Sequence, residues 1–565
     1  MKYPKQIPAL LALCASLAFA DPVPPEVDFP DYGTYPDSYA FQEDPSKPLP
    51  LPAGVTMPET LDGMRNLPTQ VKFPATPAGS KADPKQVLFE TQQAFDVFSW
   101  QTFIALNWPS DPSHAGLPDA SVLIGEKPAA PRVWNSFIPP EDVFKSGGAK
   151  PDDYEATEVK ESGPLTITKR THLLNELDEA FFNLEQPLPP IVDTNNEYIR
   201  YEVRLNQTEY DFIVTGAELD GNHYPLYSRL GQRRFIGKGG KITFPDGCIE
   251  LKVAWKKIGT GDDASRFFTR EVDVIDNPTA GQTAAKKETY GMIAMHIMYL
   301  VEGVPQWVWP TFEHVDNAPI SDLRGSTRKI VGEFHLGGGA PFDNWKDGKG
   351  GSDASDYNPL AKRYNLFDPA AASKDMGLYI GGFSPESREA MMTTNQINNG
   401  GAQNYFQKKE AQNITVPARM PSQITKVITA NNAIIASKWT YALNGKMHWM
   451  LRQGGADSVW QNYRLVTTQW PSDPEITKTW QDELDTWNKA HPGKEQLMSS
   501  GTIKAGNPAP VSLGNTAAET YMQINGSCMN CHSGATLNFT YPSLDEPWLN
   551  QKPDSDFSFM LQRAQ

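Results

Sequence analysis

The sequence is poor in cysteine, and after its first twenty residues it has no apolar run long enough to cross a membrane. Four cysteines are present in 565 residues, and one of them, Cys14, lies in the N-terminal segment. The other three, Cys248, Cys528 and Cys531, are too few to form a disulfide scaffold in a protein of this size. The longest later apolar run, residues 292–301, is about half of the ~18 residues that indicate a membrane span.

Motifs that identify several enzyme classes are also missing. The sequence contains no nucleophile elbow, phosphate-binding loop, zinc-protease helix or dinucleotide-binding fingerprint. The sequence therefore offers no direct support for the chemistry of those classes.

Basic residues are fewer than acidic residues. There are 51 Lys and Arg residues against 67 Asp and Glu residues, which gives a net charge of −16 at pH 7. This balance argues against nucleic acid and against an anionic membrane surface as partners. From net charge alone, a redox partner protein attracted by charge is expected to be basic.

The first twenty residues have the layout of a secretory signal peptide. Lys2 and Lys5 precede a compact apolar run at residues 10–19, and small residues lead to a cleavage site after Ala20. Cys14 raises the alternative of a lipoprotein signal, but the residue before it is larger than that cleavage usually accepts. We therefore expect a periplasmic or secreted protein, whose net charge is −18 once the two lysines are removed.

Composition divides the mature chain into three parts. Residues 21–84 contain fourteen prolines and little periodicity, which predicts an extended arm that buries little apolar area, with residues 21–60 removable. Residues 85–500 form the body, which opens with a predicted helix over about 85–106 because its apolar residues have helical spacing. Residues 501–565 form a C-terminal unit, in which residues 515–524 are predicted to be helical.

The body is predicted to be a sheet-rich α+β domain with scattered helices, on which a small helical C-terminal unit docks. Apolar and polar residues alternate from residue 199 to 206 and from 249 to 258, as in half-buried strands. The runs 290–301 and 305–315 are separated by a short Gly-containing link, which predicts a hairpin. Asn444-Gly445 is predicted to be a second turn between strands.

The most specific motif is Cys528-Met529-Asn530-Cys531-His532. Three kinds of site fit it: a covalently bound c-type haem, a redox dithiol, and half of a zinc site. A dithiol site is typical of a βαβ context, and a zinc site needs a second ligand pair, for which Cys248 alone is a poor supplement. The signal peptide and the adjacent histidine favour haem, because c-type haem is attached outside the cytoplasm.

With this motif, the final sixty or so residues resemble the cytochrome c family. The resemblance implies one covalent haem c, with Cys528 and Cys531 as the thioether positions and His532 as the proximal iron ligand. The upstream part is similar to that of large, exported bacterial proteins with a single haem, described only as members of the cytochrome c family. That second resemblance implies no activity.

The second axial ligand is less well defined by the sequence. Met560 is the candidate distal ligand, since it is the only methionine after His532. Met57 and Met420, each followed by proline, and His448 are alternatives, as is an open sixth position. The tail after His532 is too short to enclose a haem, so the Trp- and Tyr-rich body is expected to form one wall of the pocket.

The body contains a second possible site. Glu250, His296, Glu313 and His314 lie on predicted strands that could be neighbours, and together they would suit a metal ion or acid–base catalysis. Glu313 and His314 are adjacent and should point to opposite faces of the sheet. Ordinary structural roles are therefore the favoured interpretation of these four residues.

The sequence predicts an exported protein that transfers electrons through one haem. The alternative is a haem-dependent oxidoreductase, of the oxygenase or peroxidase type, whose large body binds a small-molecule substrate. A third alternative is a binding module that uses haem only for structure. An open iron would favour the enzyme, and a methionine on the iron would favour the electron carrier.

Overall fold

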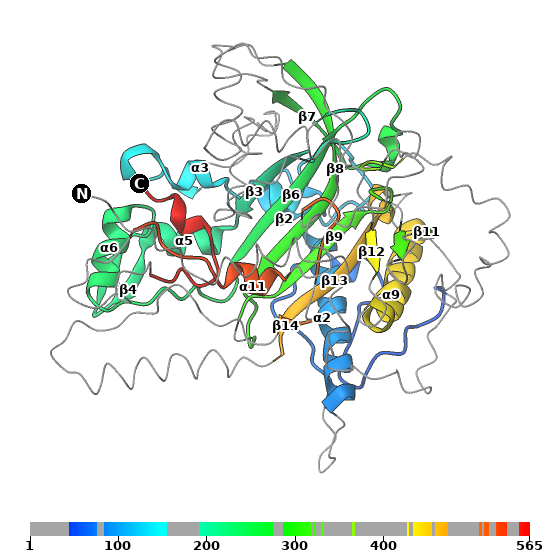
Figure 1. Cartoon of the computed structure of the whole chain (residues 1–565), viewed down its shortest axis with the longest axis horizontal. Helices are drawn as coiled ribbons and strands as arrows, with labels where there is room; N and C mark the ends of the chain where they lie inside the picture. Colours follow the sequence, from blue (N-terminus) through cyan, green and yellow to red (C-terminus); the bar gives the residue numbers. More distant parts are fainter. Residues whose placement is uncertain are drawn as a thin grey trace.

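The computed structural model of the chain is shown in Figure 1. It describes thirteen segments of the chain, within which residues 198, 305 and 319 are left out. The segments are 45–75, 84–154, 191–274, 286–322, 329–332, 364–367, 426–428, 433–454, 458–472, 508–510, 513–518, 527–539 and 553–565.

A seven-stranded antiparallel sheet forms the centre of the molecule. Six strands follow the order β14-β13-β9-β8-β6-β3, and β7 pairs with the long strand β8 outside this path. The strands predicted within residues 199–206, 249–258, 290–301 and 305–315 are confirmed, as is the hairpin between β8 and β9, where Gly303 has a φ of 82°. The strands are β3 (Arg200–Leu205), β6 (Ile249–Lys257), β7 (Thr269–Val274), β8 (Lys286–Tyr299), β9 (Trp309–His314), β13 (Tyr463–Pro471) and β14 (Pro508–Ala509).

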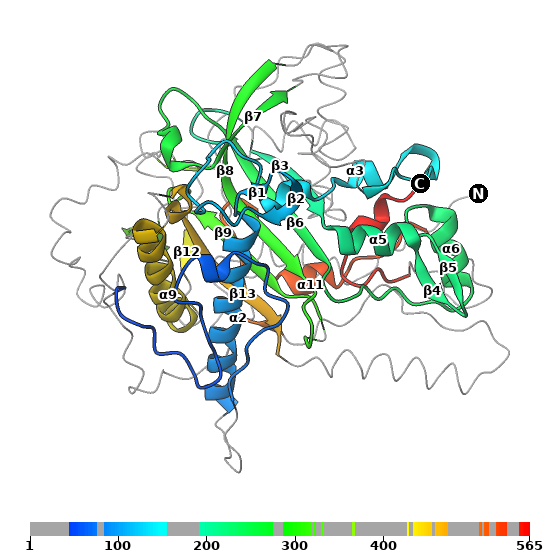
Figure 2. The ribbon, with the colours of Figure 1, turned by 180° about the vertical axis from the view of Figure 1, so that it is seen from behind.

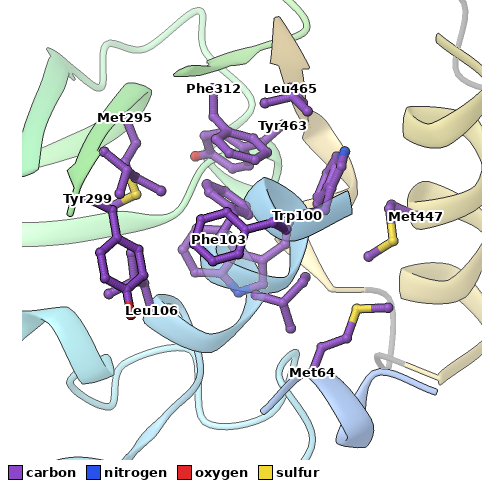
Figure 3. Close-up of a cluster of buried hydrophobic side chains, with 14 of the residues drawn as sticks. Met64, Trp100, Phe103, Leu106, Met295, Tyr299, Phe312, Met447, Tyr463 and Leu465 are labelled. Atoms are coloured by element: carbon purple, nitrogen blue, oxygen red, sulfur yellow. The ribbon is translucent and has the colours of Figure 1, made fainter. Parts of the chain in front are cut away.

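The first face of the sheet is covered by two long helices, α2 (Pro84–Leu106) and α9 (Ala433–Gly454). Figure 2 shows α2 in front of the strands. The contact is largely aromatic: Phe103 of α2 stacks on Phe312 of β9 with ring centroids 4.1 Å apart, and Trp100 meets Phe312 edge-on (Figure 3). Helix α2 confirms the predicted helix, since its apolar residues at helical spacing lie on this face.

The predicted turn at Asn444-Gly445 is wrong, because both residues lie inside α9. Burial explains the error: Trp439, Leu443 and Met447 recur at intervals of four residues and are fully buried, which is helical spacing on one apolar face. The Asn444 side chain accepts a hydrogen bond from the Trp100 indole and donates one to the backbone of β13. Tertiary contacts thus replace the turn that this dipeptide favours locally.

The Pro-rich arm also departs from expectation, since its described part buries apolar surface. Five of its side chains belong to the same core as α2 and α9, so the expectation of little burial is wrong for residues 45–75. These side chains are Leu49, Val55, Leu61, Met64 and Val71. Proline fixes the backbone of this segment without preventing its apolar residues from packing against the helices.

The second face of the sheet carries another apolar core, to which the C-terminal segments contribute. It joins strand residues such as Met298 and Trp309 to Cys528, Met529 and Met560. Helices α3 (Pro140–Val143), α5 (Gln207–Thr215) and α6 (Arg229–Gly237) lie here together with α11 (Cys528–His532) and the 3-10 helix η11 (Met560–Arg563). Figures 1 and 2 both place α6 and the C terminus at the end of the molecule opposite α9.

Short elements complete the description and join the main layers. None of the helices in the described segments is long and apolar enough to cross a membrane. The remaining elements are η1 (Asp62–Met64), β1 (Ser110–Asp111), β2 (His114–Pro118), η2 (Val133–Ser136), η3 (Ser146–Gly148), β4 (Ala217–Leu219), β5 (Asn222–Tyr224), η5 (Ala264–Arg266), β10 (Ile320–Asp322), β11 (Lys329–Gly332), β12 (Lys426–Ile428) and η8 (Val459–Asn462).

Candidate haem site

Helix α11 consists of the Cys-X-X-Cys-His motif itself. Ser527 precedes the helix, and its hydroxyl accepts a hydrogen bond from the Asn530 N–H at 3.2 Å, as a helix N-cap does. The side chains of Cys528, Cys531 and His532 lie on one side of the helix, because Cys531 and His532 follow Cys528 by three and four residues. Cys528 is buried, Cys531 is exposed and His532 is half-buried. The two thiols and the imidazole therefore share one helical turn that is partly open to solvent.

The sheet holds this turn through Gln469 of β13. The Gln469 side-chain oxygen accepts hydrogen bonds from the Met529 N–H at 2.9 Å and from the Ser527 hydroxyl at 3.2 Å. Its amide nitrogen donates to the Pro510 carbonyl at 2.8 Å. All these groups are buried or partly buried, so Gln469 fixes the start of α11 on the second face.

The segment before α11 is also tied to the sheet. The Glu313 carboxylate accepts hydrogen bonds from the Thr516 N–H and hydroxyl, at 3.1 and 2.8 Å. Arg464 neutralises this carboxylate from the neighbouring strand at 2.7 Å. Residues 516–518 form a turn rather than the start of the predicted helix, and the rest of that prediction lies outside the described residues.

The orientation of His532 is set by a residue twenty-five positions further on. Its Nδ1 atom lies 2.8 Å from the Phe557 carbonyl oxygen. Since a carbonyl can only accept, Nδ1 carries the proton, and Nε2 keeps the lone pair that a metal would need. The His532 ring also packs against the rings of Phe559 and Trp309, at centroid distances of 5.1 and 6.2 Å.

A turn with left-handed backbone conformations directs the Phe557 carbonyl toward His532. Asp556 and Phe557 have φ angles of 53° and 66°, in the left-handed region that favours glycine. The body holds this turn at two points: the Trp307 indole donates to the Asp556 carbonyl at 3.0 Å, and the Phe244 N–H donates to the Asp556 carboxylate at 2.8 Å. The position of His532 therefore depends on residues of the body.

Met560 lies in the segment that holds His532. It begins η11, three residues after Phe557, and its side chain is buried in the second core together with Trp309. Binding of iron by its sulfur stays a prediction.

Two of the alternative distal ligands lie on the other side of the sheet. His448 of α9 is buried in the first layer, where its Nε2 lies 2.6 Å from the Tyr463 carbonyl oxygen, and burial lowers its pKa to about 4. Met57 packs against the first core. Both residues are thus separated from α11 by the sheet, whereas Met420 lies outside the described residues.

The residues of the second possible site do not converge. No group of three or more His, Cys, Asp or Glu side chains among the described residues could hold a metal ion. Glu313 binds Arg464 and Thr516, as above, while His314 stacks on Phe267 at 4.4 Å and burial lowers its pKa to about 4. The half-buried His296 has Nε2 3.4 Å from the Thr311 hydroxyl.

Glu250 has a different neighbour from the one that the sequence suggested. It interacts with Glu209 of α5, and burial together with this second carboxyl raises the pKa of Glu209 well above its usual range. Cys248 is fully buried beside this pair, and burial raises the pKa of its thiol. Cys248 is thus the inert, buried cysteine that was expected.

Sequence reasoning missed Gln469, Phe557 and Trp309 as parts of the site. Gln469 acts through its side-chain amide and Phe557 through its backbone carbonyl, each on a segment distant in sequence, and a single sequence carries no signal for such contacts. Trp309 could have been suspected, because Trp307 and Trp309 alternate in the run 305–315 that predicts a strand, although β9 itself begins at Trp309. Its indole N–H is buried and has no hydrogen-bond acceptor among the described residues.

These residues fit a c-type haem. Two thiols three positions apart and an imidazole whose Nε2 carries the lone pair are the groups through which a c-type haem is held, and the rings of Trp309 and Phe559 give the imidazole aromatic neighbours. Comparisons with protein-family models, with curated proteins and with solved structures found no match for this chain.

Proposed function

We propose that this protein is an exported c-type cytochrome, which binds one haem covalently and transfers single electrons in the periplasm. One observation carries the proposal: His532 shares a helical turn with two thiols, and its Nδ1 is bound to the Phe557 carbonyl. Iron-binding histidines commonly have this second hydrogen bond, which fixes the ring and its tautomer. A zinc site would need further ligands, and a redox dithiol would not need the oriented imidazole.

Each residue of the site has a definite part in this proposal. Cys528 and Cys531 would hold the haem through thioethers, and Nε2 of His532 would bind the iron. When bound, the haem supplies a one-electron couple whose potential depends on axial ligation and burial. Phe557 keeps the imidazole in place, and Trp309 excludes water on the side of the sheet.

The C-terminal unit in this proposal is a small cytochrome c-like unit, residues 501–565, docked on the body. Met560 is its proposed distal ligand, because it is the only methionine of the sequence after His532. An open sixth position would instead support the rival function, a haem-dependent oxidoreductase acting on a small molecule. Carbon monoxide distinguishes the two, since it binds an open reduced iron at once.

The decisive experiment is expression in a host that exports the chain and attaches haem c. We expect one haem per chain, which stays with the polypeptide on a denaturing gel. Cys528→Ala combined with Cys531→Ala should abolish the haem, while the matched variant Cys248→Ala should retain it. Zinc in place of haem, or a chain without haem from a competent host, would refute the proposal.

A further inference from the structure

One surface of this acidic protein has the opposite charge. Residues 221–245 contain no Asp or Glu, although the whole chain carries −16. Five basic residues lie in this stretch, on α6 and just after it: Arg229, Arg233, Arg234, Lys238 and Lys241. We call the exposed part of α6 and its C-terminal extension, residues 230–238, the α6 surface.

The α6 surface combines basic side chains with one apolar side chain. Phe235 and Ile236 of α6 point into the second core, which leaves Arg233, Arg234 and Lys238 exposed. Leu230 is 59% exposed, the largest value among the large apolar side chains of the described residues. An apolar residue bordered by arginines is typical of a protein-binding surface.

The inner side of α6 contacts the segments that hold His532. The Gln232 amide donates to the Leu561 carbonyl at 2.9 Å, and the Arg229 N–H donates to the Gln565 carbonyl at 3.1 Å. The Arg233 guanidinium lies 5.3 Å from the centre of the Phe539 ring. A protein bound to the α6 surface would therefore be separated from the C-terminal segments by one helix, about 10 Å across.

We propose that the α6 surface docks an acidic redox protein, whose carboxylates pair with Arg233, Arg234 and Lys238 around Leu230. This proposal rests on the proposed electron-transfer function and names the class of its partner. It reverses the expectation of a basic partner, which came from net charge, because the local field at the contact steers association. Neither Arg234 nor Lys238 forms an ion pair within the described residues, so both remain available.

An acidic protein fits this surface better than an anionic membrane does. The basic stretch spans only one short helix and its extension, and the rest of the chain is more acidic than the net charge suggests. A flat anionic bilayer would also face those acidic regions and be repelled by them. A compact protein with a local acidic patch meets the α6 surface alone.

The first test measures electron transfer with ferricyanide, a small trianion, at increasing ionic strength. Repulsion by the net negative charge of the protein predicts that oxidation of the reduced haem becomes faster as salt screens the charge. Attraction at the α6 surface predicts the opposite, a rate that falls with salt. Arg234→Glu with Lys238→Glu should reverse the salt dependence, whereas Lys47→Glu with Lys72→Glu, an equal charge change at exposed lysines elsewhere, should preserve it.

The second test reads binding without using the haem. A fluorescein-labelled glutamate-rich peptide should bind the wild type and the Lys47/Lys72 variant, and the Arg234/Lys238 variant should bind at least tenfold more weakly. Peptide binding that is equal in all three proteins would overturn the inference. Phosphatidylglycerol vesicles that bind while the peptide does not would show that the partner class is wrong. A chain without haem would refute the proposed function, yet the peptide would still test the surface.

Discussion

Asp556 and Phe557 show how single residues shape the site. Each is in a left-handed conformation, which costs of the order of 1–3 kcal/mol for residues other than glycine. The cost is offset by the hydrogen bonds from Trp307 and Phe244 and by burial of the Phe557 ring. The turn directs the Phe557 carbonyl at His532, so strain is stored at the point where a metal ligand would be positioned.

Met560→Ala tests the distal ligand at the scale of one residue. If the sulfur binds iron, the variant should lose the weak long-wavelength absorption of Met–iron bonding, bind carbon monoxide readily and have a lower reduction potential. It should also be destabilised by about 2–5 kcal/mol, because it leaves a cavity in the core.

The matched control is Met298→Ala, which removes a methionine of similar burial from the same core. We expect it to lose similar stability while keeping the absorption band and the resistance to carbon monoxide. A wild type that already binds carbon monoxide at once and lacks the band would exclude Met560 as a ligand.

At the scale of elements, α11 depends on β13. Gln469→Leu should leave the Met529 N–H and the Ser527 hydroxyl without their acceptor, at a cost of about 1–3 kcal/mol. We expect less haem per chain and a perturbed haem spectrum. Gln92→Leu is the control, since it removes a buried glutamine that hydrogen-bonds on the first face; it should lower stability and leave the spectrum unchanged.

The contact of α2 with the sheet contains a buried carboxyl that makes stability depend on pH. Burial raises the pKa of Asp96 from 3.8 to about 6. The folded state thus binds the proton more tightly than the unfolded state does. The contribution of the protonated Asp96 to the free energy of unfolding is therefore full below pH 3.8 and is lost as pH rises through 6. The shift of about two units corresponds to about 3 kcal/mol.

Asp96→Asn should therefore increase stability at pH 8 and have little effect at pH 4, as urea unfolding would show. The amide can still accept from Thr468 and Gln92 and can donate to Thr440. Asp119→Asn should act in the opposite direction, because hydrogen bonds from Ser121 lower the pKa of Asp119 to about 2 and so stabilise its charged form. Equal pH profiles for wild type and Asp96→Asn would show that the Asp96 carboxyl does not titrate in this range.

Local patterns predicted some elements and missed others for physical reasons. The β8–β9 hairpin and α2 carry strong periodicity and short links, which suffice to define them. Helix α9 was missed because Asn444-Gly445 favours a turn locally, and burial of one helix face together with the Asn444 hydrogen bonds to Trp100 and Leu465 overrides that preference. The arm was misjudged because composition does not reveal that Leu61 packs in the same core as residues of α2 and α9.

The site divides in the same way. The motif alone singles out His532 and the two cysteines as candidates, because their spacing is visible in the sequence. The Phe557 carbonyl could not be found, because its role depends on a backbone conformation and on a contact across twenty-five residues. The net charge did not predict the α6 surface, because a sum over the whole acidic chain does not report a local excess of arginine.

At the scale of the whole molecule, the sheet explains why a long chain precedes the motif. Its first face is closed by α2, α9 and the arm, and its second face supplies Gln469, Glu313 and Trp309 to the C-terminal segments. Among the described residues, the apolar side chains around His532 belong to one core with strands of the sheet. Body and C-terminal unit should therefore be a single cooperative unit.

Unfolding in urea tests this cooperativity. We expect the tryptophan fluorescence of the body and the haem absorbance to change in one coincident transition with the same midpoint and slope, because the shared core cannot separate without exposing apolar surface on both sides. Gln469→Leu should move the midpoints of both signals to lower urea. If the substitution frees the C-terminal segments from the sheet, the haem signal should change at lower urea than the tryptophan signal. Gln92→Leu should shift both midpoints together. A wild-type haem signal that changes at lower urea than the tryptophan signal would show instead that the haem-bearing unit is an independent domain, and that its contacts with Trp309 and Gln469 contribute little to its stability.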